Sequence, residues 1–323
     1  MKSIKAVIGA LAVFTCAIAG AQNYPAKTVT MIIPFAAGGP TDVIGRVLAQ
    51  SMAKQLGQTV IVENVTGAGG TIATRRLKRS DPDGYTFLVH HLGYTTAPSL
   101  YRPAPYDAVN DFEMLGLITD VPMTLVSNPK FPAKDFKELV AYVKEHKKSV
   151  NLANAGPGAV SHLCGMLLQN AIGVELTTIP YKGTGPALSD LMGGQVDLLC
   201  DQITNTGSPI KAGKVKVYGS TTRTRLPGFP DIPTLHEAGL PNFEVVIWHG
   251  AYAPKGTPKP VLDKLNGALK AALKDPYVIE RFAMINTVPV EDARVAPDVH
   301  KKFVVDEVAK WSKVITAVGA YAE

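Results

Sequence analysis

The first third of the chain alternates short apolar runs with segments in which apolar residues recur at helical spacing. Residues 42–56 place four apolar side chains on one helical face, namely Val43, Val47, Leu48 and Met52. The predicted strands are 28–34, 59–63 and 86–91, and the predicted helices are 42–56 and 72–79. Such a rhythm predicts an α/β fold in which helices cover both faces of parallel sheets.

The same rhythm returns in the middle of the chain. The predicted helices there are 135–147, 162–171 and 187–192, and the predicted strands are 150–153, 176–180 and 196–200. Two amphipathic helices follow near the C-terminus, at 258–274 and 297–318. The pattern therefore indicates two α/β units of Rossmann type in one chain.

Two extended stretches lie at the edges of the second unit, at residues 115–127 and 243–252. A chain that crosses to a second domain and returns needs two such connections, which together form a hinge of two strands. We therefore predict that lobe 1 consists of residues 22–122 and 246–323 and that lobe 2 consists of residues 123–245.

The first 21 residues have the features of a cleavable export signal. Lys2 and Lys5 precede the apolar run 6–19, and a small-residue site ends at Ala21. The run is shorter than the roughly 20 residues that span a bilayer. We expect cleavage after Ala21 and a periplasmic location.

Cleavage leaves two of the three cysteines, Cys164 and Cys200. Two cysteines in an oxidising compartment can form a disulfide. The sequence does not show that their Cα atoms come within the roughly 7 Å that a disulfide needs, and we expect two buried free thiols.

Composition limits the classes of function. The 323 residues are 46% apolar and 19% charged, which is typical of a globular protein, and the length suggests about two domains. The net charge is +6, and no basic run with interleaved aromatic residues occurs. We therefore expect no nucleic-acid partner, and we expect a monomer.

Four glycine-rich loops follow predicted strands and precede predicted helices. They are 34–42, 67–71, 155–162 and 181–186. Glycine lets the backbone approach a ligand closely, and the N-terminus of a helix favours an anion. In open α/β sheets such loops line the ligand crevice, so the pattern predicts an anion-binding cleft between the two units.

Sequence motifs of common enzymes do not occur. The chain contains no G-x-x-x-x-G-K-[ST], H-E-x-x-H, C-x-x-C or G-x-S-x-G, and its histidines lack a spacing that specifies a metal site. Ser161 and His162 suggest a nucleophile and a base, but adjacent side chains diverge around a helix. We expect no enzyme activity, no metal and no cofactor, with a secreted hydrolase that uses Ser161 and His162 as the alternative.

Several segments together resemble one family. They are VTMIIPFAAGGPTD (29–42), DPDGY (81–85), PYKG (180–183), GGQVD (193–197), FPDIP (229–233), EAGL (237–240) and APKGTP (253–258). In this order and spacing they resemble the extracytoplasmic solute receptors of tripartite tricarboxylate transporters, the Bug family. The resemblance runs from about Tyr24 to the last predicted helix.

The resemblance implies a two-lobed periplasmic-binding-protein fold of type II that closes over a small organic acid. It implies that the acid, such as a dicarboxylate or a tricarboxylate, is held largely by main-chain groups and ordered waters in the first lobe. Membrane permease subunits of the transporter would then receive it. A sensor that reports the ligand to a signalling partner is a further alternative.

By motif position, the resemblance also implies which residues contact the ligand. From lobe 1 these are Phe35, Gly38, Gly39, Thr41 and Asp42, with His91 and Tyr94 close by, and from lobe 2 they are Ser161, His162, Lys182, Gly183, Thr184 and Asp201. Asp42 and Asp201 would accept hydrogen bonds from the ligand or from water, or would orient the loops. The bulky His91 and Tyr94 also suggest an aromatic acid that stacks on them.

Overall fold

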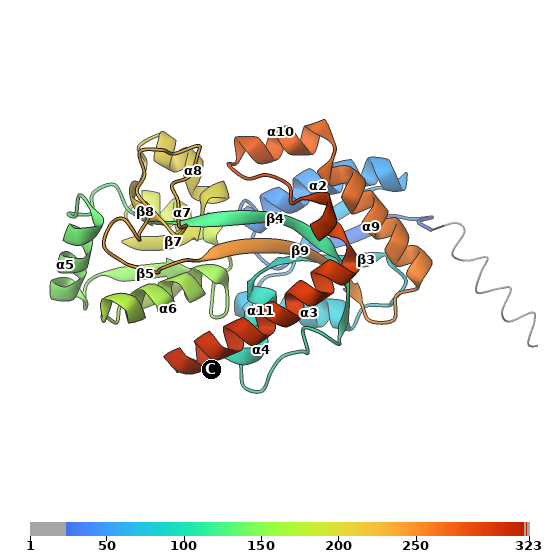
Figure 1. Ribbon diagram of the computed structural model, residues 1–323, viewed down its shortest axis with the longest axis horizontal. Coiled ribbons are helices and arrows are strands. Elements are labelled where there is room, and N and C mark those ends of the chain that lie inside the picture. The colour runs from blue at the N-terminus through green and yellow to red at the C-terminus, as the bar shows by residue number, and fades with distance from the viewer. Residues whose placement is uncertain (1–23, 320, 322–323) are drawn as a thin grey trace, which may run out of the picture.

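A computed structural model describes residues 24–319 and residue 321, so the predicted signal peptide at 1–21 lies outside the described residues. Figure 1 shows two bodies that share one twisted sheet. The strand order is β2-β1-β3-β9-β4-β7-β5-β6, and β8 pairs with β4. Two long strands, β4 (Phe112–Ser127) and β9 (Val246–Pro254), run between the bodies, which confirms the predicted pair of lobes joined by two strands.

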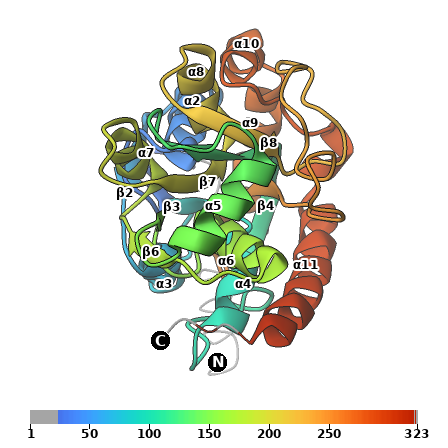
Figure 2. The ribbon, with the colours of Figure 1, turned by 90° about the vertical axis from the view of Figure 1, so that its left-hand side faces the viewer.

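The remaining elements divide between the bodies. Lobe 1 contains β1 (Val29–Ile33), α2 (Pro40–Leu56), β2 (Val60–Asn64), η1 (Ala68–Gly70), α3 (Thr71–Lys78), β3 (Thr86–His91), α4 (Gly93–Leu100), α9 (Lys259–Leu273), α10 (Pro276–Met284), η2 (Asp292–Val295) and α11 (Pro297–Val318). Lobe 2, which faces the viewer in Figure 2, contains α5 (Phe136–His146), β5 (Asn151–Asn154), α6 (Val160–Ile172), β6 (Thr177–Pro180), α7 (Thr184–Met192), β7 (Leu198–Gln202), α8 (Ile203–Lys211) and β8 (Lys216–Ser220).

The sheet is mixed, whereas the sequence predicts parallel sheets. β1 pairs in parallel with β2 and β3, and β5 pairs in parallel with β6 and β7. The pairs β3–β9, β4–β9 and β4–β7 are antiparallel. The physical reason is that β4 leaves lobe 1 while β9 returns to it, so the two neighbouring strands run in opposite directions.

The pairing of β4 changes partway along the strand. Up to Pro122 it pairs with β9, and from Met123 it pairs with β7. The exact division of the chain at 122/123 and 245/246 stays a prediction. None of the helices in the described part of the chain is both long and apolar enough to cross a membrane.

Strand β1 shows why the apolar runs form central strands. Met31 and Ile33 pack on one side of the sheet with Leu48 of α2, while Ile32 packs on the other side with Leu77 of α3. Both faces are buried, so the strand is apolar at nearly every position. On α2, Leu48 and Met52 are buried as predicted, whereas Val43 and Val47 are only half-buried and Ile44 completes the buried face.

The cysteines form a disulfide, so the expectation of two free thiols is wrong. The Cα atoms of Cys164 and Cys200 lie 6.1 Å apart, within the range that a disulfide requires. Cys164 lies on α6, which packs against β7, the strand that carries Cys200. Both residues are buried.

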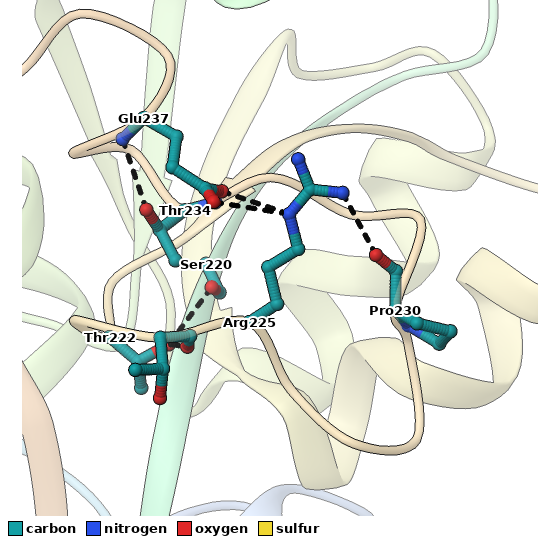
Figure 3. Close-up of polar contacts among 7 residues, drawn as sticks. Ser220, Thr222, Arg225, Pro230, Thr234 and Glu237 are labelled. Carbon is teal, nitrogen blue, oxygen red and sulfur yellow. Dashed lines mark hydrogen bonds and ion pairs between the residues drawn. The ribbon is translucent and has the colours of Figure 1, made fainter.

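A long segment of lobe 2, residues 221–245, contains no helix or strand of its own. We call it the Arg225 loop. Thr234 and Glu237 bond reciprocally, since each backbone N–H donates to the side chain of the other, as in a capping box. Arg225 donates to the Glu237 carboxylate and to the Pro230 carbonyl oxygen (Figure 3). Polar contacts between side chains and backbone therefore hold this segment.

Candidate ligand site between the lobes

A small cavity of about 10 Å³ lies where the two lobes meet. Lobe 1 lines it with Phe35, Pro40, Thr41 and His91, and lobe 2 lines it with Ala155, Val160, Ser161, Thr184, Asp201 and Gln202. Neither Arg nor Lys is among these described residues. This volume has room for about one water molecule, so we expect the two lobes to move apart before an organic molecule enters.

In lobe 1, Asp42 shapes the loop between β1 and α2. Its Oδ2 accepts hydrogen bonds from the Gly38 N–H and the Arg46 Nε, both at 2.9 Å, and its Oδ1 accepts one from the Asn64 amide at 2.8 Å. Burial alone would raise the pKa of Asp42, but these hydrogen bonds outweigh it and lower that pKa. Asp42 is therefore an ionised residue whose hydrogen bonds go to its own loop and to neighbouring side chains, and it does not line the cavity.

Histidines form the deeper part of the lobe 1 wall. His91 stacks on Phe35 with 4.6 Å between ring centroids, and His249 Nε2 lies 3.3 Å from the Thr41 hydroxyl. Burial, with a smaller contribution from the neighbouring histidines, lowers the pKa of His91 well below its usual value. Burial lowers the pKa of His249 to about 3. Both rings are therefore neutral at pH 7, and this wall offers dipoles but no positive charge.

In lobe 2, Ser161 and His162 begin helix α6. The Ser161 hydroxyl accepts a hydrogen bond from the Ala155 N–H at 2.8 Å, and His162 Nδ1 lies 3.4 Å from the Gly158 N–H that donates to it. Both side chains therefore bond to the loop that precedes their helix. The structure describes both residues and gives no hydrogen bond between them.

Asp201 is a fully buried carboxyl group in the cavity wall, within β7. Its Oδ2 accepts a hydrogen bond from the Asn205 amide at 2.6 Å, whereas its Oδ1 has no partner in the described part of the chain. Burial raises the pKa of Asp201 to about 6, and the hydrogen bond from Asn205 is the largest opposing effect, ahead of those of the nearby Gln202 backbone and Thr184 side chain. Gln202 Oε1 is likewise buried without a described partner. Unpaired buried acceptors are costly in a folded protein, so these two oxygens mark a place where a donor is missing.

The structure brings part of the predicted site together. The predicted residues that line the cavity are Phe35, Thr41, His91, Ser161, Thr184 and Asp201. The predicted residues that belong to the surrounding loops and helix starts without lining it are Gly38, Gly39, Asp42, His162, Lys182 and Gly183.

Tyr94 lies away from the cavity, contrary to expectation. Its ring stacks on Tyr252 with centroids 3.9 Å apart, and its hydroxyl donates to the Ala108 carbonyl oxygen at 2.6 Å. The physical reason is that α4 begins at Gly93, so the chain turns after β3 and Tyr94 packs into the core of lobe 1. A ligand in the cavity therefore cannot stack on Tyr94.

The loops predicted to line the cleft include Pro40, Ala155 and Val160, although these residues are not among the predicted ligand contacts. Sequence reasoning missed Gln202 and, behind Thr41, His249. Gln202 directly follows Asp201 at the end of β7, so its position at a strand end could have identified it as a site residue. His249 gave no such signal, because only the pairing of β9 beside β3 brings it to His91.

Comparisons with known proteins place the chain in a family. The sequence model described as "Tripartite tricarboxylate transporter family receptor" matches residues 44–320. A UPF0065 protein of Agrobacterium vitis, from the TAR-I ttuE-ttuC' intergenic region, is 49% identical over 303 residues, which cover 94% of this chain and 88% of that protein.

Solved structures agree with this placement. The periplasmic binding protein BugD superposes with a TM-score of 0.91 at 50% identity, covering 93% of this chain and all of that chain. MatC of Rhodopseudomonas palustris, solved with bound malate, gives a TM-score of 0.88 at 42% identity and covers 90% of this chain and all of its own. The fold is thus that of periplasmic binding proteins, and the chain belongs to the receptor family of the tripartite tricarboxylate transporters.

Proposed function

We propose that the protein is a periplasmic receptor that binds a small organic carboxylate between its lobes and delivers it to the permease subunits of a tripartite transporter. The observation that carries this proposal is the cavity between the lobes, which is lined by the starts of helices α2 and α6 and by the buried Asp201. Membership of the receptor family supports transport as the role. The predicted signal peptide supports a periplasmic location, and we propose a monomer.

The helix starts suit the carboxylate groups of the ligand. Pro40 opens the 17-residue helix α2 and Val160 opens the 13-residue helix α6, and both residues line the cavity. The N-terminus of a helix carries a partial positive charge and free N–H groups, which favour an anion without any Arg or Lys. The similarity to MatC with bound malate agrees with this class of ligand.

Asp201 limits the class of carboxylate that we propose as the ligand. A plain acid would place negative charge near a buried carboxyl group that ionises at about pH 6. An acid that also carries a hydroxyl or an ammonium group would instead donate to Asp201 Oδ1 and satisfy it. We therefore propose a small hydroxy or amino di- or tricarboxylate in place of an aromatic acid, since Tyr94 stacks on Tyr252 in the core and Phe35 already stacks on the ring of His91.

The lobes close over the ligand through the β4–β9 hinge. The Ala36 N–H of lobe 1 donates to the Lys182 carbonyl oxygen of lobe 2 at 2.9 Å, next to the cavity. A ligand that contacts both lobes is held only while they are together, so binding favours the closed state.

The hydrolase alternative gains no support. A nucleophilic serine needs a base within hydrogen-bond reach, but Ser161 bonds to the Ala155 N–H and His162 to the Gly158 N–H. We therefore propose that the protein is not an enzyme. A sensor would bind its ligand in the same way, and the family favours the transport role.

A thermal-shift screen tests the proposed function. Malate, citrate, aspartate, succinate, benzoate and a neutral sugar are added in increasing concentration to the mature protein. We expect the melting temperature to rise with the concentration of a hydroxy or amino acid, and we expect no hydrolysis of p-nitrophenyl esters. Stabilisation by the sugar alone, or ester turnover that Ser161→Ala abolishes, would contradict the proposal.

A further inference from the structure

A tyrosine joins the two lobes outside the cavity. Tyr101 follows helix α4 of lobe 1, and its hydroxyl donates to the Pro157 carbonyl oxygen of lobe 2 at 2.5 Å. Pro157 lies in the loop between β5 and α6. Neither residue lines the cavity.

The tyrosine ring also packs against this loop. Gly158 has a φ of +84°, and a Cβ atom added there would lie 2.9 Å from Tyr101 Cε2. A Cβ atom on Gly69 of lobe 1 would lie only 1.9 Å from the Pro157 carbonyl oxygen. The two glycines therefore allow Pro157 to sit tightly between Gly69 and Tyr101.

The position of this contact connects it to the ligand site. The loop that Tyr101 holds begins at Ala155 and leads into Val160, and both of these residues line the cavity. Tyr101 thus contacts the outer part of the same loop whose ends face the ligand. Burial raises the pKa of the half-buried Tyr101 hydroxyl, so this hydroxyl remains a donor throughout the physiological pH range.

We propose that Tyr101 is an interlobe latch that sets ligand affinity and release rate by stabilising the closed lobes, without contact with the ligand. The latch rests on the proposed function, because it acts on a receptor that opens and closes. A contact present only in the closed state shifts the closed-to-open ratio by its own strength. Loss of one such hydrogen bond is expected to lower that ratio about fivefold.

The variant Tyr101→Phe removes the hydroxyl and keeps the ring. The matched control is Tyr24→Phe, which loses a hydrogen bond from the Tyr24 hydroxyl to the Gly84 carbonyl oxygen within lobe 1, and neither of these residues lines the cavity. Single-molecule energy transfer between dyes on Arg75 of lobe 1 and Lys144 of lobe 2, both exposed, measures the closed-to-open ratio without ligand. Stopped-flow measurements with malate as the probe give the dissociation constant and the release rate.

We expect Tyr101→Phe to lower the closed-to-open ratio about fivefold and to raise the dissociation constant for malate by the same factor through faster release. Tyr24→Phe should change neither quantity. An unchanged closed-to-open ratio in Tyr101→Phe would overturn the latch, whether or not malate binds. If malate fails to bind the wild type while the ratio still falls in Tyr101→Phe, the latch stands and malate is ruled out as a ligand.

Discussion

Two carboxyl groups of lobe 2 have pKa values that are shifted in opposite directions. In the Arg225 loop, the exposed Glu237 accepts hydrogen bonds from the Thr234 N–H and from Arg225, and these lower its pKa. In the cavity wall, Asp201 is fully buried, keeps one oxygen unpaired, and has its pKa raised to about 6 by burial. Glu237 is satisfied by the fold, whereas Asp201 is left with an unused acceptor.

We propose that this difference separates a carboxylate that stabilises the fold from one that binds the ligand. Natural proteins pair nearly all of their buried polar groups, and the exceptions gather at binding and catalytic sites. Asp201 also lies in the wall of the cavity between the two lobes. A substitution at Asp201 should therefore change ligand affinity, whereas a substitution at Glu237 should not.

The largest effect on folding should come from the disulfide below the cavity wall. Cys164 lies one turn after Ser161, and Cys200 directly precedes Asp201. The bridge closes a loop between residues 36 positions apart, so its loss in the double variant Cys164→Ala, Cys200→Ala should lower the free energy of unfolding by about 3–4 kcal/mol. Urea unfolding measures this, and an unchanged midpoint would show that the bridge contributes nothing to stability.

The second-largest effect should be on the affinity for the ligand. Asp201→Asn replaces the acceptor with an amide that cannot match its charge, so the affinity for a hydroxy or amino acid should fall about 10- to 100-fold, as expected for a hydrogen bond to a charged group. Glu237→Gln is the matched control and should leave affinity unchanged. Equal effects of the two variants on affinity would remove the distinction between the two carboxyl groups.

The smallest effect should be the pH dependence of binding. The folded, ligand-free protein holds the pKa of Asp201 at about 6, above its usual value, and a ligand that donates to the carboxylate lowers that pKa in the complex. Binding therefore releases a proton near pH 6, and affinity should weaken as pH falls below 6, by at most about tenfold per pH unit. The dissociation constant measured from pH 7.5 to 5 checks this, and Asp201→Asn should remove the Asp201 contribution to the slope.

Much of the fold could be predicted from the pattern of apolar residues. Helices and strands with strong periodicity, such as α2 and β1, can be found in this way because local sequence determines them. Helices α4 and α8 escape it because they contain Pro98 and Pro209, and proline usually ends a helix. Local sequence therefore predicts the two α/β lobes, but it does not predict every helix and strand within them.

The candidate site is less predictable for a different reason. Motif positions identify Thr41, Ser161 and Asp201, which line the cavity. The disulfide and the burial of Tyr94 depend on how α6 meets β7 and how α4 packs on lobe 1, which no local pattern specifies. Site residues that come from strands distant in the sequence can therefore be identified only in the structure.

Calorimetric titration of the mature protein with malate, citrate, aspartate and succinate tests the central claim most directly. We predict binding of one hydroxy or amino carboxylate per protein molecule, weakened about 10- to 100-fold by Asp201→Asn and unchanged by Glu237→Gln. Absence of binding by all four acids, or binding that Asp201→Asn leaves unchanged, would contradict the account.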